Sequence, residues 1–286
     1  MVGLGLGDED DITVKGMKIV QKCDLVVLEA YTSVLGIDKD RLEKVYGKEI
    51  LVADRDIVES QAEDKILVKD KEVAFLVVGD PLCATTHTDL WLRARHLGIE
   101  VKIVHNASIM GAAASSGLSL YNFGQTVSIP FFEENWKPTS FVPKIEYNIK
   151  GGMHTLCLLD IKVKEPDFDA MMKGKTKYLP PRFMSVSTAA QQLIESQTIV
   201  ENTSYGGALC VGLARMGQDT QQIVAGTLEE LAKCDMGGPL HSLIICGDVH
   251  DLEIEVLKEY LIEGSTYDFD QPNSGDKEQS PPPGDK

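Results

Sequence analysis

The chain has 286 residues, of which 43% are hydrophobic, and its formal net charge at pH 7 is −16. This length allows two domains with buried cores, while the acidic balance argues against direct binding to nucleic acid, which depends on Lys and Arg side chains. No apolar stretch approaches the roughly 20 residues that span a bilayer, and the first residues resemble no signal peptide, so we expect a cytoplasmic protein without membrane contact.

The first half of the chain alternates strand-like and helix-like segments. The glycines of GLGLG, residues 3–7, precede an acidic stretch and then a helical pattern. Strands separated by helical stretches of about 10 to 15 residues indicate right-handed crossovers and a mostly parallel sheet. We therefore assign residues 1–131 to an N-terminal α/β domain. Strands are predicted at 24–30, 73–80, 101–106 and 126–130, and helices at 86–96 and 108–117.

The second half is also mixed α/β, but its connections are longer, which favours some antiparallel pairs. Residues 132–148 contain Trp136, two prolines and mixed charge, and are interpreted as a connection between the halves. We assign 132–265 to a second α/β domain and the hydrophilic residues 266–286 to a disordered tail. Strands are predicted at 155–163, 208–217 and 241–247, and helices at 185–196 with a cap at Ser185, 227–235 and 250–261.

The stretch VVGDPLCATTH, residues 77–87, contains the first candidate site. Asp80 follows a buried apolar run at the carboxyl end of a predicted strand, where open α/β folds bind ligands. The residues around GLGLG are acidic and lack the spacing G-x-G-x-x-G, so they do not suit a pyrophosphate. A carboxylate beside such a loop suits a ligand with hydroxyls, an amine or a sulfonium, whereas the alternative is that Asp80 and Pro81 only form a turn.

The six cysteines are widely spaced, and most stand in apolar runs. Free cysteine is usually buried, so this pattern favours reduced core thiols over disulfides. No C-x-x-C pair is present, and no metal site is expected.

Several motifs together resemble the diphthine synthases, which belong to the tetrapyrrole-methylase class of S-adenosylmethionine-dependent methyltransferases. The resemblance extends from Val2 to about Val249, in order and with nearly uninterrupted spacing. It rests on GLGLGDEDDITVKG, LEAYTSVL, VVGDPLCATTH, VHNASIM, GMHTLCLLDIKVKEP, GLARMG and GGPLHSLII.

The resemblance implies a homodimer of two-domain α/β subunits, with S-adenosylmethionine bound in the cleft between the domains. It also implies that the acceptor is a 3-amino-3-carboxypropyl group on a histidine of translation elongation factor 2. In the eukaryotic members both the amine and the carboxylate receive methyl groups, which gives diphthine methyl ester. Candidates for the dimer interface are Leu118, Tyr121, Phe131 and Phe132.

The family's cofactor contacts are carried over position by position, and no metal is implied. Cys83, after Leu82, departs from the family, which usually has Gly after Phe at these positions. No catalytic residue is assigned: the amine must lose a proton, which water, Asp80 or a nearby histidine could accept. The implied cofactor residues are Leu6, Asp80, Cys83, Ser108, Ile109, Leu159, Met216 and His241.

Two other functions remain open at this point. One is a corrin-type or siroheme-type tetrapyrrole methyltransferase, although LEAYTS and GMHTLCLLDIKVKE favour the diphthine branch. The other is a catalytically silent relative that only binds the elongation factor, against which Gly5, Asp80 and Ser108 argue. The family also carries more apolar residues before the glycines, so either the first strand is truncated here or the true start of the protein lies upstream.

Overall fold

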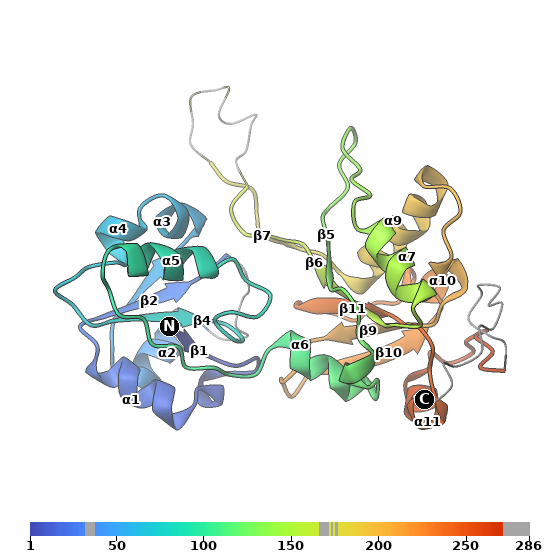
Figure 1. Cartoon of the computed structure of the whole chain (residues 1–286), viewed down its shortest axis with the longest axis horizontal. Helices are drawn as coiled ribbons and strands as arrows, with labels where there is room; N and C mark the ends of the chain where they lie inside the picture. The colour runs from blue at the N-terminus through green and yellow to red at the C-terminus, as the bar shows by residue number, and fades with distance from the viewer. Residues whose placement is uncertain (32–37, 166–171, 173, 175–176, 271–286) are drawn as a thin grey trace, which may run out of the picture.

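The computed structural model describes residues 1–31, 38–165, 172, 174 and 177–270. Two large β-sheets, one in each half of the chain, stand side by side, and each is covered by helices (Figure 1). A small two-stranded sheet pairs residues 161–162 with 182–183. This arrangement confirms the predicted α/β class with a parallel N-terminal sheet and a mixed second sheet.

The first sheet has the strand order β1-β4-β2-β3, and all its pairs are parallel. Its first strand, β1, contributes only two residues, which pair with Leu76 and Val77 of β4. The elements of this half are β1 (Val2–Gly3), η1 (Glu9–Asp11), α1 (Val14–Lys22), β2 (Leu25–Glu29), α2 (Lys39–Tyr46), β3 (Ile50–Ala53), α3 (Arg55–Glu59), α4 (Ala62–Lys65), β4 (Val73–Val77) and α5 (Thr88–His96).

Strand β4 shows why this sheet is buried on both faces. Its side chains alternate between two hydrophobic clusters: Ala74 and Leu76 pack with Val20 and Leu42, whereas Phe75 and Val77 belong to the opposite cluster. Helices α1 and α2 cover the first face, and α3, α4 and α5 cover the second (Figure 1). A continuous apolar run is the pattern that a parallel strand between two helix layers requires.

The second sheet has the order β10-β9-β11-β6-β5, in which only β5 and β6 pair in parallel. The antiparallel pairs expected in this half are therefore present. Its elements are α6 (Ile109–Ala112), η2 (Ala113–Ser116), η3 (Leu120–Asn122), β5 (Val127–Ile129), α7 (Val142–Lys150), β6 (Thr155–Leu159), β7 (Ile161–Lys162), β8 (Arg182–Phe183), α9 (Val186–Ile199), η4 (Tyr205–Gly207), β9 (Cys210–Ala214), β10 (Gln222–Gly226), α10 (Leu228–Leu231), β11 (His241–Ile245) and α11 (Asp251–Tyr260).

Strand β6 likewise separates two clusters in the second half. Cys157 packs on the face covered by α7, α9 and α10, whereas Leu156 packs on the face that α11 helps to cover. The expected cap of α9 is present, since the Ser185 hydroxyl accepts a hydrogen bond of 3.1 Å from the backbone N–H of Thr188. All cysteines are free, and four of them are buried: Cys23, Cys157, Cys210 and Cys246.

Two sequence-based assignments are wrong. Residues 101–106 form no strand, because β1 offers only Val2 and Gly3, and Val104 makes a single bridge to Val2. Within 132–148, interpreted as a connection, helix α7 begins at Val142. Pro143 lies in the first turn of this helix, where its missing N–H costs nothing and its fixed φ is favourable.

Strand β5, which the sequence placed in the N-terminal domain, is hydrogen bonded to β6 of the second sheet. The preceding residues Ala113 and Leu118 also pack in the second half, in the cluster that contains Leu257. Leu118 is therefore a core residue and not part of an exposed interface, whereas Tyr121 is fully exposed. We propose that the domain boundary lies near residue 107 and not at 131.

The predicted disordered tail is wrong for its first residues, 266–270, while 271–286 lie outside the described residues. The rings of Tyr267 and Phe269 contact each other edge to face, with 5.1 Å between their centroids, and both pack against the cluster around Leu257. The backbone N–H of Thr266 donates to Glu230 at 2.7 Å. Two aromatic side chains bury enough apolar surface to order a stretch that is otherwise polar.

Across the described part of the chain, none of the helices is both long and apolar enough to cross a membrane.

Tyr267→Ala should lower the free energy of unfolding by about 1–3 kcal/mol, because it removes a half-buried ring from the core surface. Tyr121→Ala is the matched control, since this ring is fully exposed and its loss should be near neutral. Urea denaturation of both variants measures the difference. Equal stability of the two variants would show that residues 266–270 are solvated, as their composition alone predicts.

Candidate functional site

The glycine loop lies against the end of β4. The N–H of Gly79 donates to the carbonyl of Gly5 at 2.7 Å, and the N–H of Gly5 donates back to Gly79 at 3.2 Å. Both glycines have a φ near +80°, which other residues rarely adopt. This pairing places Leu6 next to Val78 and Gly79 on one wall of a cavity.

Asp80 follows directly and is only 3% exposed. Its carboxylate accepts hydrogen bonds from the N–H of Leu82 at 2.9 Å, from the N–H of Asn106 at 3.1 Å and from Nδ1 of His105 at 2.8 Å. Burial by itself raises the pKa of Asp80, but these three hydrogen bonds outweigh it and hold the pKa below its usual value. Asp80 therefore fastens the loop after β4 to the segment around Asn106.

The second half contributes the facing wall. Strand β6 presents Leu158 and Leu159, the turn after β9 presents Arg215 and Met216, and β11 begins with His241. The turn touches the glycine loop directly: a Cβ on Gly7 would stand 2.5 Å from the carbonyl oxygen of Gly217. The two halves thus meet backbone to backbone beside the cavity.

His241 is 8% exposed, and both of its ring nitrogens are engaged. Nδ1 accepts from the N–H of Val186 at 3.1 Å, so Nε2 carries the proton and donates to the carbonyl of Gly238 at 2.9 Å. Burial lowers the pKa of His241, which keeps the ring neutral at pH 7. The ring can therefore offer a ligand an apolar surface but no free nitrogen.

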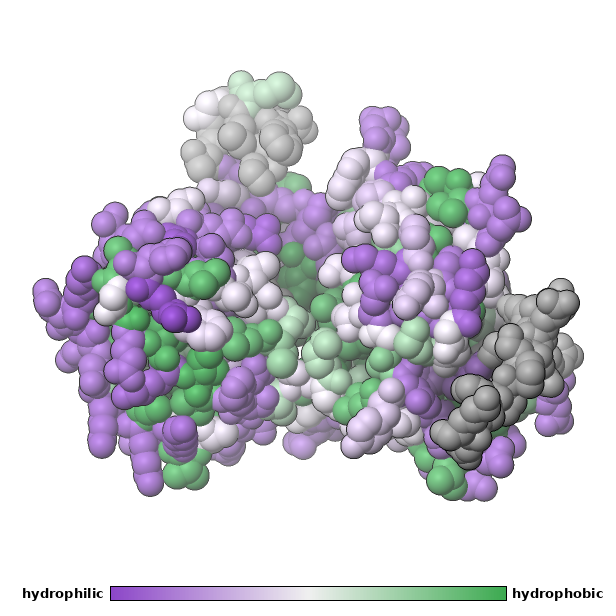
Figure 2. Space-filling view, viewed as in Figure 1, coloured by the Kyte–Doolittle hydropathy of each residue, from purple (hydrophilic) through white to green (hydrophobic). Residues whose placement is uncertain are grey.

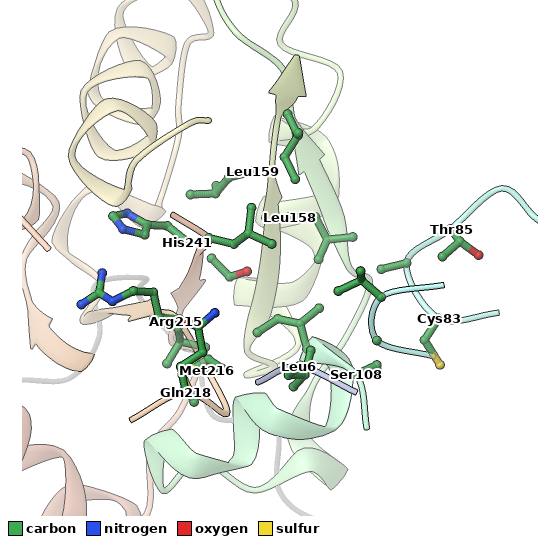
Figure 3. A pocket seen from close by; sticks show the side chains of 18 residues that line it. Leu6, Cys83, Thr85, Ser108, Leu158, Leu159, Arg215, Met216, Gln218 and His241 are labelled. Carbon is green, nitrogen blue, oxygen red and sulfur yellow. The ribbon is translucent and has the colours of Figure 1, made fainter. Parts of the chain in front are cut away.

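These residues line one cavity between the two halves (Figure 3). Figure 2 shows it as a hollow between the lobes with hydrophobic side chains at its floor. The structure brings together Leu6, Cys83, Ser108, Ile109, Leu159, Met216 and His241 from the sequence-predicted set. The other lining residues are Val78, Gly79, Ala84, Thr85, Leu158, Ile161, Leu213, Arg215, Gln218, Leu240 and Ser242.

Asp80 is the one predicted residue that does not line the cavity. Its carboxylate is turned into the loop that it organises, and its neighbours Gly79 and Cys83 reach the cavity in its place. Burial raises the pKa of the Cys83 thiol, so this side chain is a protonated, neutral part of the wall.

The histidines next to the motifs do not line the cavity either. His87 is 1% exposed and packs edge to face on Phe75 at 5.2 Å, while His154 is fully buried beside Glu253. Burial lowers the pKa of both imidazoles, which suits neutral core residues. His105 remains exposed next to Asp80.

Sequence reasoning did not single out Leu158, Arg215 or Gln218. Leu158 precedes a predicted site residue on β6, and Arg215 precedes Met216 in GLARMG, so both stand inside motifs that had been recognised. Nothing in the spacing shows that two successive residues of a strand end or a turn can both reach a cavity, because that depends on local twist.

The chain is similar to known proteins along most of its length. Residues 1–232 match the family Tetrapyrrole (Corrin/Porphyrin) Methylases. The chain is 52% identical over 271 residues to the diphthine methyl ester synthase of Schizosaccharomyces pombe, covering 94% of this chain and 96% of the relative. It is 53% identical over 272 residues to the Homo sapiens diphthine methyl ester synthase, covering 92% and 94%.

The fold agrees with this similarity. A crystal structure of diphthine synthase aligns with a TM-score of 0.78 at 31% sequence identity, covering 91% of this chain and 94% of the other.

Asp80→Asn should destabilise the protein by about 1–3 kcal/mol at pH 7, because an amide cannot accept from all three donors and leaves a buried N–H unsatisfied. The folded-state pKa of Asp80 is lowered, so its stabilisation is present above the unfolded pKa of about 3.9 and is lost as pH falls through the folded value. The stability difference between Asp80→Asn and the unaltered chain should therefore shrink below about pH 4.

Urea denaturation across this pH range measures that difference. Asp70→Asn, at an exposed turn, is the control and should be near neutral throughout. A difference that stays constant down to pH 2 would mean that the carboxylate charge has no part in holding the loops.

Proposed function

The chain belongs to the diphthine methyl ester synthases of the tetrapyrrole methylase family, methyltransferases of diphthamide biosynthesis, and from this premise we propose that the cavity between its halves binds S-adenosylmethionine. One observation carries the proposal: seven residues assigned to the cofactor from separate motifs, distant in sequence, line a single cavity. The residues that would contact it are Leu6, Ser108, Ile109, Leu159, Met216 and His241.

The lining fits this cofactor chemically. It is mostly apolar, with backbone and hydroxyl groups at Gly79, Thr85 and Ser108, and it includes no Lys, Asp or Glu among the described residues. Such a surface suits a nucleoside and a sulfonium, and its described residues lack the cluster of cations that a polyphosphate needs.

When bound, S-adenosylmethionine supplies a methyl group activated by a positively charged sulfur. The chain's own part is to orient the acceptor and to keep water out, which the apolar walls from Leu158, Leu159 and Ile161 would do. No nucleophilic side chain is required, because the acceptor itself is the nucleophile.

We propose that the acceptor is the 3-amino-3-carboxypropyl group on a histidine of translation elongation factor 2, methylated on its amine and on its carboxylate. The carboxylate is ionised at neutral pH, whereas the amine must first lose a proton. Because the described residues of the lining include no carboxylate, and His241 has no free nitrogen, we propose that water accepts this proton.

Each added methyl group removes an N–H donor from the amine, so a fixed set of hydrogen bonds cannot hold the acceptor through the series. Docking of the intact factor would hold it instead, and the net charge of −16 favours a basic docking surface. We also propose a cytoplasmic homodimer. The fully exposed Tyr121 remains a candidate for its interface, while Phe131 and Phe132 are partly buried against the second core.

A tetrapyrrole acceptor is disfavoured, because the relatives at 52% and 53% identity are diphthine methyl ester synthases. A silent elongation-factor-binding relative is separated from the enzyme by the two experiments that follow.

Gly217→Ala should weaken binding of S-adenosylhomocysteine at least tenfold in calorimetry. Gly217 has φ +84°, and a Cβ there would stand 2.9 Å from Cβ of Leu6, so the two walls must move apart. Gly98→Ala is the matched control, because it has φ +75° but open space around it. Both variants should lose about 1–2 kcal/mol of stability from the left-handed backbone. Equal affinity in the two variants would argue against ligand binding at this contact.

Incubation with S-adenosylmethionine and elongation factor 2 carrying the aminocarboxypropyl group should raise the factor's mass in successive methyl steps. One of these methyl groups should be removed by mild base, because it is an ester. A short peptide with the same modified histidine should be a much poorer substrate. Cofactor binding without any mass increase would make the chain a silent relative, and equal turnover of peptide and factor would contradict docking.

A further inference from the structure

Arg215 is the one side chain with a formal charge at neutral pH among the described residues that line the cavity. It lies in the turn after β9, beside Met216 and near His241 (Figure 3). Arg215 is half-buried, so its charge is partly solvated, and a cation held in a largely apolar wall is a suitable partner for an anionic group of a ligand.

The guanidinium is held firmly by neutral acceptors. Nε donates to the carbonyl and the hydroxyl of Thr220 at 3.0 and 3.1 Å. Nη1 donates to the carbonyls of Met236 and Gly238 at 2.5 and 2.7 Å. Within the described residues Nη2 makes no hydrogen bond, and no carboxylate lies within ion-pair distance of the group. The charge is therefore fixed in position but not neutralised.

The backbone of Arg215 shows the same constraint. Its φ is +50°, in the left-handed region that residues other than glycine rarely occupy, and its N–H donates to the carbonyl of Leu240 at 2.8 Å. Backbone strain of this kind persists only where the surroundings fix it, and it is often found at ligand sites. The turn thus holds a guanidinium at the wall of the cavity in a fixed orientation.

We infer that Nη2 of Arg215 binds the carboxylate of an amino-acid tail. The inference rests on the proposed function, because an aminocarboxypropyl group is present in both of its ligands: it forms the methionine end of the cofactor, and it is the acceptor on the elongation factor. Arginine donates to carboxylates through planar N–H groups in fixed directions, which a preoriented guanidinium offers at low entropic cost.

The competing interpretation is that Arg215 only ties its turn to residues 236–238. The two roles differ in which ligands they affect. Loss of a hydrogen bond to a carboxylate would weaken the binding of only those ligands that have the amino-acid tail. A disturbed turn would weaken the binding of every ligand of the cavity and would lower the stability of the fold.

The test compares two ligands by calorimetry on the full chain: S-adenosylhomocysteine, which has the tail, and 5′-methylthioadenosine, which keeps the nucleoside and sulfur without it. The variant is Arg215→Gln. Thr220→Val is the matched control, because it removes an acceptor of Nε at an exposed position and keeps the charge. Thermal unfolding of each variant, and KM and kcat for the modified elongation factor, complete the set.

If Arg215 binds the carboxylate of the cofactor, Arg215→Gln should weaken the binding of S-adenosylhomocysteine by about tenfold to hundredfold and leave the binding of 5′-methylthioadenosine unchanged. If Arg215 instead binds the carboxylate of the acceptor, the affinities for both nucleoside ligands should stay unchanged. The KM for the elongation factor should then rise at least tenfold, with kcat little changed. Thr220→Val should show neither effect.

Equal weakening of the two ligands, with lowered thermal stability, would overturn the inference and leave Arg215 as a structural tie. So would unchanged affinities and an unchanged KM. Failure of the unaltered chain to bind S-adenosylhomocysteine at all would instead overturn the proposed function, and the inference with it.

Discussion

The close approach of two glycines, Gly7 and Gly217, is the contact on which the site depends. A Cβ on Gly7 would stand 2.5 Å from the carbonyl oxygen of Gly217, and a Cβ on Gly217 would stand 2.9 Å from Leu6. Only backbone can come this near. Because Leu6 and Met216 are the immediate chain neighbours of these glycines, the contact brings both side chains to the same cavity.

Each half supplies rigid supports behind this contact. Asp80 joins the loops of the first half through three hydrogen bonds. His241, at the start of β11, is hydrogen bonded through one ring nitrogen to Val186 of α9 and through the other to Gly238. The polar atoms of these two side chains are hydrogen bonded to other parts of the protein, so they do not face the cavity. Among the described residues of the lining, the one formal charge is that of Arg215.

Sequence alone could predict the parts that local pattern or motif controls. The apolar run at β4 indicated a strand covered on both faces, and the motifs pointed to seven residues that the fold brings to one cavity. The sheet membership of β5 could not be predicted in this way, because three residues carry no information about their partner strand. Residues 266–270 were misjudged because their polar composition hides two aromatic rings that find a core surface.

The role of Asp80 shows a second limit. Its position at the end of a strand was predicted, but the direction of its side chain depends on the N–H groups of Leu82 and Asn106, one of which is distant in sequence. A motif gives the residue, while tertiary hydrogen bonding decides whether it touches the ligand or supports those that do. Arg215 was missed because the sequence does not show which residues surround it, and its charge is notable only since the other described lining residues are uncharged.

A crystal structure of the chain with S-adenosylhomocysteine tests the central claim most directly. The ligand should contact Leu6, Ser108, Met216 and His241, with Gly7 and Gly217 still in contact. Ligand density in the other large hollow of the described chain, which is lined by Met1, Phe75 and Val101, with the cavity between the halves empty, would contradict it.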